Sequence, residues 1–256
     1  MTQIPSPHPF RPEMAVLRAG LAAGSALRGG VIVLGNFDGF HRGHQFLIRS
    51  ARRIAADGRA VGVMSVEPHP RQVFSPDAAP FRLALPEQKH GTARRIGLDY
   101  LFEPAFDRAF AGMSPCDFID EVLCRRLGVS HVVVGADFHF GAKRAGTTRT
   151  LTQEGTARGI GVTVLPLQGG FSSTAARQAI LAGDMRQARH CLGRPREAVL
   201  DPGQRLAPAQ IRPPAGLYRV RVPHGARPRP VRLDTEGRLL SAESLPRRIE
   251  FLDRRG

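Results

Sequence analysis

The chain has 256 residues, 42% hydrophobic and 23% charged, which suits one full-size domain with a smaller addition and excludes wholesale disorder. The formal net charge is +15, but the basic residues come in pairs rather than runs, and all except Lys89 and Lys143 are arginine. This pattern disfavours nucleic acid as a partner and equally suits a phosphate-rich small ligand.

Cysteine usage and hydropathy bear on where the protein works. Cys116, Cys124 and Cys191 are odd in number and widely spaced, which favours inert thiols in a reducing compartment over a zinc site or disulfides. The apolar stretch at 14–27 is broken by Arg18, so it does not resemble a signal peptide. No run reaches 18 apolar residues. We expect a cytoplasmic protein without a membrane partner.

In chain order, residues 1–30 resemble a leader that is first proline-rich and then rich in alanine and glycine. Short apolar runs then alternate with stretches of helical spacing. Ser114 and Pro115 form a helix start, and Gly128 a helix stop. The predicted strands are 31–34, 60–66, 98–102, 131–134 and 162–165, and the predicted helices are 43–56, 114–128, 151–158 and 173–191, the last broken at Gly183.

The alternation of strands and helices predicts parallel pairing through right-handed crossovers. We therefore expect an α/β fold, with a parallel-sheet domain over 31–195. Beyond Gly193 the helical periodicity disappears and prolines and arginines accumulate. The tail 196–256 contains short strand candidates at 217–222 and 249–252, so it is expected to be a small β-rich unit or a poorly ordered extension.

The segment between the first predicted strand and the first predicted helix is the strongest candidate site. Ligands of open α/β sheets bind at such junctions, and Gly35, Gly39 and Gly43 let the backbone approach a phosphate closely. His41 and His44 are three residues apart, so both imidazoles can face one anion at the helix start. The alternative is a glycine-rich turn with two surface histidines. Neither a dinucleotide-binding fingerprint nor a P-loop is present.

Three further segments follow other predicted strands and are expected to meet the first at one sheet edge. Residues 170–177 open a helix where Ser172 or Ser173 and then Arg177 can hold phosphate; the alternative is an ordinary cap with a solvent arginine. Residues 67–71 form a proline-stiffened loop or a plain connector. Residues 135–147 mix aromatic, glycine and basic residues, which suits a planar ring or a flexible loop.

These motifs resemble the bacterial FAD synthetases, which are bifunctional riboflavin kinase/FMN adenylyltransferases. The resemblance covers about residues 16–195. It rests on Gly-Asn-Phe-Asp-Gly with His-x-Gly-His at 35–44, Glu-Pro-His-Pro at 67–70, Gly-x-Asp-Phe-x-Phe-Gly-x-x-Arg-x-Gly at 135–146, Ser-Ser-Thr-x-x-Arg at 172–177 and Leu-Gly-Arg-Pro at 192–195.

The resemblance implies a Rossmann-like α/β/α nucleotidyltransferase domain. It also implies an FMN adenylyltransferase that transfers AMP from ATP to FMN with Mg²⁺, giving FAD and pyrophosphate. It implies catalytic roles for His41, His44 and Arg177. The residues expected to bind ATP are Gly35, Asn36, Phe37, Gly39, His41, Gly43, His44, Ser172, Ser173, Thr174 and Arg177. The residues expected to bind FMN are Asp38, Glu67, Pro68, His69, Pro70, Asp137, Phe138, Phe140 and Arg144. The metal ligands stay open.

Two departures from the family pattern keep other functions open. Ala175 stands where the family usually has arginine, and the Pro-Thr-Ala-Asn motif of the family's kinase barrel does not occur. The tail 196–256 is therefore expected to be a degenerate remnant of that barrel or an extension, without riboflavin kinase activity, and a separate kinase would supply FMN. The alternatives are a non-catalytic paralogue that binds flavin or nucleotide, and a nucleotidyltransferase for another phosphorylated acceptor.

Overall fold

The computed structural model describes residues 14–222 and 227–255. Their contacts divide the chain into two compact units. The parallel-sheet unit comprises the described residues up to Asn36 together with Phe46–Phe74 and His90–Leu167. The antiparallel-sheet unit comprises Phe37–Gln45, Ser75–Lys89 and the described residues from Gln168 onward.

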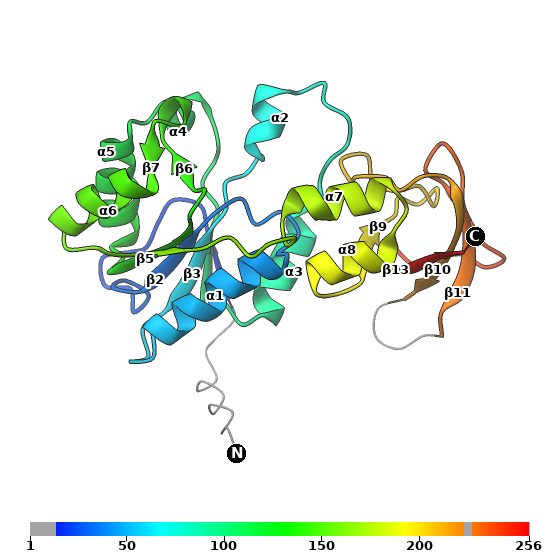
Figure 1. The fold of residues 1–256 in the computed structure, drawn as a ribbon, viewed down its shortest axis with the longest axis horizontal. Coiled ribbons are helices and arrows are strands. Elements are labelled where there is room, and N and C mark those ends of the chain that lie inside the picture. The colour runs from blue at the N-terminus through cyan, green and yellow to red at the C-terminus, as the bar shows by residue number, and fades with distance from the viewer. Residues whose placement is uncertain (1–13, 223–226, 256) are drawn as a thin grey trace, which may run out of the picture. The chain divides into compact units, whose positions relative to one another are not determined.

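The parallel-sheet unit is built on six parallel strands in the order β1-β4-β3-β2-β5-β8. Figure 1 shows β2, β3 and β5 side by side within it. Because β2 pairs with both β3 and β5, the strand order reverses between β2 and β5, which is where ligands bind in open α/β sheets. The strands are β1 (Ala15–Leu17), β2 (Val31–Leu34), β3 (Val61–Met64), β4 (Tyr100–Phe102), β5 (His131–Gly135) and β8 (Gly161–Leu165).

The central strands are buried along their length because the chain covers both faces of the sheet. Every residue of β2 and β3 is buried, and Ile32, Leu34 and Met64 join a core with the helical segment η1 (Phe118–Leu127). Ser114 caps the helical turn before η1, and Gly128 ends η1 in a left-handed conformation, as its lack of a Cβ allows.

The remaining elements before the antiparallel sheet are a small hairpin and the helices. A small hairpin pairs β6 (His139–Phe140) with β7 (Gly146–Thr147). The helices are α1 (Arg42–Ile54), α2 (Pro70–Phe74), α3 (Pro86–Arg95), α4 (Arg108–Ala111), α5 (Pro115–Asp117), η1 (Phe118–Leu127), η2 (Ala142–Arg144), α6 (Thr148–Ala157), α7 (Ser173–Leu181) and α8 (Met185–Leu192).

The antiparallel-sheet unit contains five strands in the order β12-β11-β10-β13-β9. Alternate residues such as Tyr218, Val220 and Phe251 point into one core, where α7 and α8 add apolar side chains. Figure 1 shows α8 beside β9 and β13, with which it is in contact. The strands are β9 (Arg196–Val199), β10 (Gly216–Arg221), β11 (Arg229–Leu233), β12 (Leu239–Leu240) and β13 (Arg248–Arg255).

The α/β fold with its parallel sheet and a β-rich tail is confirmed. All five predicted parallel strands form, and the predicted break at Gly183 separates α7 from α8. The expected leader 1–30 needs correction, because Ala15–Leu17 pairs with β4 as a sixth strand; its first 13 residues lie outside the described part. The tail is a folded sheet rather than a poorly ordered extension.

Candidate functional site: an aromatic pocket and a loop for an anion

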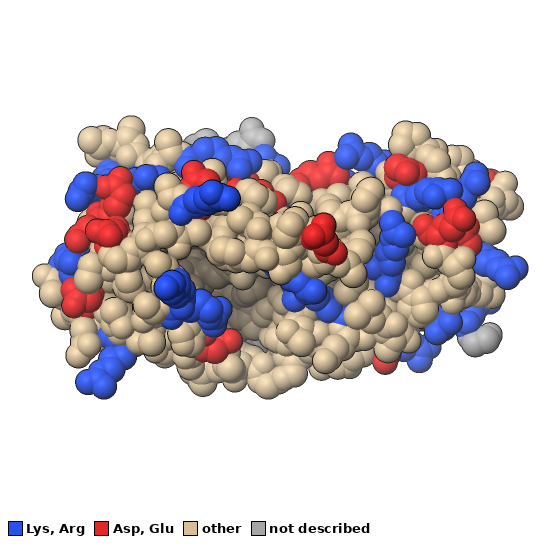
Figure 2. Space-filling view, turned by 90° about the horizontal axis from the view of Figure 1, so that it is seen from above, with Lys and Arg blue, Asp and Glu red and all other residues tan. Residues whose placement is uncertain are grey.

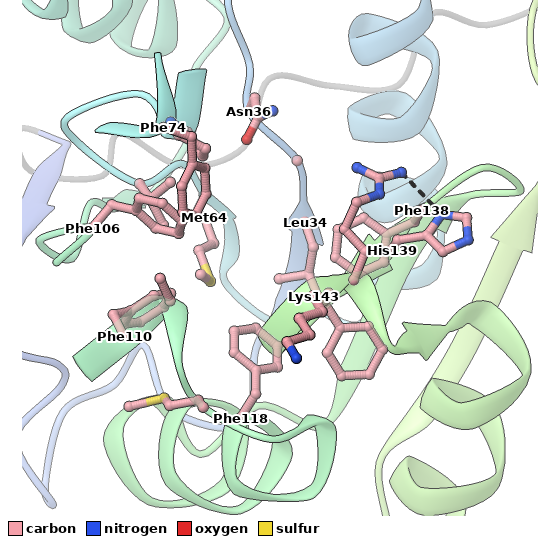
Figure 3. Close-up of a pocket in the computed structure, with 18 residues that line it drawn as sticks. Leu34, Asn36, Met64, Phe74, Phe106, Phe110, Phe118, Phe138, His139 and Lys143 are labelled. Atoms are coloured by element: carbon pink, nitrogen blue, oxygen red, sulfur yellow. Dashed lines mark hydrogen bonds between the residues drawn. The ribbon is translucent and has the colours of Figure 1, made fainter. Parts of the chain in front are cut away.

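An apolar cavity of about 470 Å³ opens in the parallel-sheet unit at the carboxyl ends of β2, β3 and β5. It lies where the strand order reverses. Figure 3 shows phenylalanine and methionine side chains gathered around it, with Asn36 at one end and Lys143 at another. Its lining comprises Leu34, Gly35, Asn36, Met64, Val66, Pro70, Phe74, Phe106, Phe110, Ala111, Met113, Phe118, Phe138, His139, Phe140, Gly141, Lys143 and Arg144.

Six phenylalanine rings follow one another around this cavity. Phe138 and Phe140 are nearly parallel, at an interplanar angle of 14°. A cavity lined by aromatic faces suits a flat, apolar ring system, which can stack on them and bury its surface. The successive centroid distances are 5.6 Å for Phe74–Phe106, 6.1 Å for Phe106–Phe110, 6.3 Å for Phe110–Phe118, 5.3 Å for Phe118–Phe140 and 5.7 Å for Phe140–Phe138.

Two exposed cations stand at the mouth of the cavity. Lys143 and Arg144 both have positive φ angles, 53° and 60°, which non-glycine residues rarely adopt. The Arg144 guanidinium lies 3.3 Å from Nδ1 of His139. Figure 2 shows a hollow on this face of the molecule with Lys and Arg side chains at its rim. An anionic group on a bound ring would meet positive charge as it leaves the cavity.

The loop 37–45 belongs to the antiparallel-sheet unit and has a strained backbone. Phe37 and Phe40 have φ angles of 47° and 44°, and both side chains are fully buried. A Cβ at Gly39 would come within 3.1 Å of Leu83, and one at Gly43 would lie 2.7 Å from the carbonyl oxygen of Phe171. The loop therefore needs glycine at these two positions.

The imidazoles of His41 and His44 stack above this loop, with centroids 3.7 Å apart at an angle of 24°. The backbone N–H of His44 donates to Nδ1 of His41 at 3.4 Å, so neutral His41 carries its proton on Nε2. Burial, together with Arg177 and Arg194, lowers the pKa of His41 to about 4 against the opposing effect of Asp38. Burial and the neighbouring His41 also lower the pKa of His44 well below its usual value. At neutral pH the pair offers uncharged N–H donors.

The buried side chain of Asp38 stabilises the loop through hydrogen bonds. Its carboxylate is 4% exposed and accepts the backbone N–H groups of Leu83 and Ala84 at 3.0–3.1 Å. It also accepts Nη2 of Arg177 at 2.8 Å. Four hydrogen bonds fill the acceptor sites of the two oxygens. Asp38, which the sequence predicts to bind FMN, is not among the residues that line the aromatic cavity, and its side chain turns toward these partners.

The start of α7 joins the same loop. Ser172 caps the helix by accepting the N–H of Ala175, and Ser173 Oγ donates to the carbonyl oxygen of Asp38 at 3.2 Å. Thr174 is exposed beside them. The Nε–H of Arg177 also donates to the carbonyl oxygen of Phe81, and its Nη1 has no hydrogen-bond partner among the described residues. The structure thus brings the two predicted phosphate motifs together at a helix N-terminus, which favours anions.

Two arginines near the loop were not among the predicted site residues. Arg194 donates to the carbonyl oxygen of Gly39 at 2.8 Å. Arg196 is fully buried, and burial lowers its pKa to about 10 against the opposing effect of Asp38 and Glu197. Together with Arg177 they give the neighbourhood of His41 an excess of positive charge, which suits a polyanion. Only the Leu-Gly-Arg-Pro run gave a sequence signal for Arg194.

The residues predicted to bind FMN fall into two groups. Pro70, Phe138, Phe140 and Arg144 line the aromatic cavity, whereas Glu67, Pro68, His69 and Asp137 do not. Gly35 and Asn36, predicted to bind ATP, also line it. Phe37, predicted beside them, is fully buried under His44, with ring centroids 4.6 Å apart. The cavity's other aromatic residues come from 74–118, where the sequence has no motif.

No group of three or more His, Cys, Asp or Glu residues that could hold a metal ion occurs within 14–222 and 227–255. Within the same ranges, no helix is long and apolar enough to cross a membrane.

A parallel sheet of this order, with a His-x-Gly-His loop after its central strand, defines an α/β protein of the nucleotidyltransferase type. The chain belongs to the FAD synthetase family: the sequence model described as FAD synthetase matches residues 24–174.

Relatives at the sequence level are named bifunctional riboflavin kinase/FMN adenylyltransferases. The protein from Pseudomonas fluorescens is 41% identical over 173 residues, which is 66% of this chain and 55% of that protein. The protein from Escherichia coli K12 is 38% identical over 175 residues, 65% of this chain and 55% of that protein. The chain therefore matches only about half the length of these curated relatives.

The fold recurs in a crystal structure described as a macrolide-efflux protein from Streptococcus pneumoniae. The TM-score is 0.78 at 23% identity, with 94% of this chain and 90% of that chain covered. At this identity the likeness shows the fold alone.

Proposed function

We propose that the protein is an FMN adenylyltransferase, which transfers AMP from ATP to FMN and releases FAD and pyrophosphate. The observation that carries the proposal is the aromatic cavity of about 470 Å³ with Lys143 and Arg144 at its mouth. A flavin is a flat ring system with a phosphate on a short chain, and it matches both features. Membership of the FAD synthetase family supports the same substrate.

The loop unit supplies the proposed triphosphate side. His41 and His44 offer neutral N–H donors, Ser172 to Thr174 begin a helix, and Nη1 of Arg177 is available. The chain passes from Asn36, in the cavity lining, to Phe37, in the loop unit, across one peptide bond. One segment therefore contributes consecutive residues to the two proposed substrate sites.

In the proposed reaction an FMN phosphate oxygen attacks the α-phosphorus of ATP in line. A new P–O bond forms, the bond from that phosphorus to the bridging oxygen breaks, and its electrons leave with pyrophosphate. No covalent enzyme intermediate is needed, and an anionic phosphate needs no strong general base. Catalysis consists of alignment and of donors aimed at developing charge, with His41 Nε2–H as one donor.

Mg²⁺ is proposed to enter with ATP. Because no three-residue ligand cluster occurs among the described residues and Asp38 is fully engaged, triphosphate oxygens and water would provide most of its ligands. When bound it would neutralise phosphate charge.

The test is FAD formation from FMN, ATP and Mg²⁺ by purified protein, followed by chromatography. We expect FAD and pyrophosphate in equal amounts, and about 10²-fold lower kcat for His44→Ala. Absence of FAD, or a His44→Ala variant as active as the unmodified protein, refutes the proposal. FMN binding without turnover would indicate the non-catalytic paralogue, and AMP transfer to another phosphate in a panel would indicate a different acceptor.

We further propose that this chain has no riboflavin kinase activity and depends on a separate kinase for FMN. Support comes from the missing Pro-Thr-Ala-Asn motif and from the inner face of the antiparallel sheet. That face is filled by Tyr218, Val220 and Phe251, packed in one core with side chains of α7 and α8. Riboflavin and ATP should give no FMN; its appearance would contradict the proposal.

A further inference from the structure

We infer that the antiparallel sheet of the C-terminal stretch positions the loop 37–45, and that Arg194 and Gln210 are the positioning residues through which it acts. The inference rests on the proposed function in so far as this loop binds the triphosphate. It gives the tail a role in adenylyl transfer although the tail is expected to have lost kinase activity.

The first link joins the loop to the segment 81–84, which we call the backing segment. Asp38 accepts the backbone N–H groups of Leu83 and Ala84. Arg177, which is paired with Asp38, donates to the carbonyl oxygen of Phe81. A shift of the backing segment would therefore move Asp38 and Arg177 together.

The second link joins the backing segment to the tail. The N–H of Arg82 donates to the carbonyl oxygen of Ala209 at 3.1 Å, and the N–H of Ile211 donates to the carbonyl oxygen of Arg82 at 3.0 Å. Leu83 packs in the same core as Ile211. The backing segment therefore lies between the loop and residues 209–211, hydrogen-bonded to both.

Gln210 ties residues 209–211 to the sheet. Its side chain is fully buried; Oε1 accepts the N–H of Val199 in β9, and Nε2 donates to Oε1 of Gln88, each at 2.8 Å. Gln88 Oε1 also accepts the N–H of Leu85, one residue beyond the backing segment. Buried amides are costly unless every polar atom is paired, so this network favours one arrangement of the three segments.

Arg194 binds the loop directly. It lies two residues before β9 and donates Nη2 to the carbonyl oxygen of Gly39, the left-handed residue at the turn of the loop. Its charge also acts on His41. The stretch 194–211 thus holds the loop directly through Arg194 and indirectly through Gln210.

The experiment uses full-length protein and four variants. Gln210→Leu removes the buried amide at similar side-chain volume. Arg194→Met removes the hydrogen bond to the carbonyl oxygen of Gly39, and Arg194→Lys keeps the positive charge. Val231→Ala is the matched control, because Val231 is 1% exposed in the core of the same sheet, on β11, and its apolar side chain can form no hydrogen bond to the loop or backing segment. The measurements are kcat, KM for ATP and for FMN, thermal midpoint, and the His41 pKa by NMR without ligand.

We expect Gln210→Leu and Arg194→Met to lower kcat about tenfold and to raise KM for ATP several-fold, because the phosphate donors lose alignment. KM for FMN should stay unchanged, since the aromatic cavity shares no residue with this network. The His41 pKa should rise from about 4 toward its ordinary value of 6.5. Arg194→Lys should recover most activity, and Val231→Ala should lower only the thermal midpoint.

The inference is overturned if Gln210→Leu and Arg194→Met lose activity only in proportion to their folded fraction, as the control does, with the His41 pKa unmoved. Absence of FAD formation by the unmodified protein would instead refute the proposed function. In that case calorimetric ATP binding and the His41 pKa still decide whether the sheet positions the loop.

Discussion

Replacing Asp38 with asparagine tests how much stability depends on one buried charge. Asparagine keeps the shape and one acceptor oxygen, so the backbone N–H groups of Leu83 and Ala84 can retain a partner. The lost charge leaves Arg177, whose side chain is 19% exposed, without its carboxylate partner, and leaves the fully buried Arg196 with Glu197 alone to compensate it.

The expected cost follows from that burial. Removing one member of a buried ion pair typically costs about 3–5 kcal/mol, because the remaining charge stays desolvated. The lower end applies here, since Arg177 keeps some solvent contact and the Phe81 carbonyl oxygen. A loss of about 3 kcal/mol lowers the thermal midpoint of a domain this size by roughly 6–12 °C.

Urea unfolding followed by circular dichroism measures this cost. The matched control is Asp57→Asn, which breaks the exposed Asp57–Arg59 pair at 2.7 Å and should change stability little. If Asp38→Asn is as stable as the unmodified protein, or no less stable than the control, the carboxylate does not brace the loop as argued.

The remaining predictions concern the Tyr100 hydroxyl, the Phe138 ring and the protonation of His41. Tyr100→Phe should leave stability unchanged or raise it, because the buried hydroxyl has no hydrogen-bond partner in the described structure; a loss above about 1 kcal/mol in urea contradicts this. Phe138→Ala should raise KM for FMN roughly fivefold and leave KM for ATP unchanged, because it removes one stacking face; equal changes in both constants contradict it. Neutral, buried His41 has a pKa of about 4 against 6.5 unfolded, so the unfolded chain binds the extra proton between these values. Protonation of His41 should therefore lower the free energy of unfolding by up to about 3 kcal/mol from pH 6.5 to 4; His41→Asn should remove this contribution and keep that of His44, whose pKa is also lowered.

The sequence identified the parallel sheet well because its strands have a simple signature. Runs such as Val31–Leu34 are apolar throughout, as strands covered on both faces must be. Caps such as Ser114 and stops such as Gly128 act locally, and both were predicted. The three-residue strand β1 was missed because its stabilisation comes from pairing with β4, which lies about 85 residues away in the chain.

The candidate site was predictable only where its residues lie close together in the sequence and form a motif. His41 and His44 stack because of their spacing at the start of α1, which a motif can report. Phe74, Phe106 and Phe110 line the cavity from two short helices and a loop, so only the folded chain brings them together. A single phenylalanine in a loop has no sequence pattern that separates pocket lining from core.

The positive charge illustrates why position decides what a residue type means. Several arginines of the antiparallel sheet pair with carboxylates, as in the cross-strand pairs Arg219–Asp253 and Arg221–Glu250. Such partly exposed pairs stabilise little and leave no strong field for a polyanion. Arg177 and Arg196 differ because they are partly or fully buried near one carboxylate, Asp38, and among the carboxylates that act on them only Glu197 adds negative charge, at Arg196. A triphosphate would supply the missing negative charge there, whereas a net charge of +15 spread over the surface would not select it.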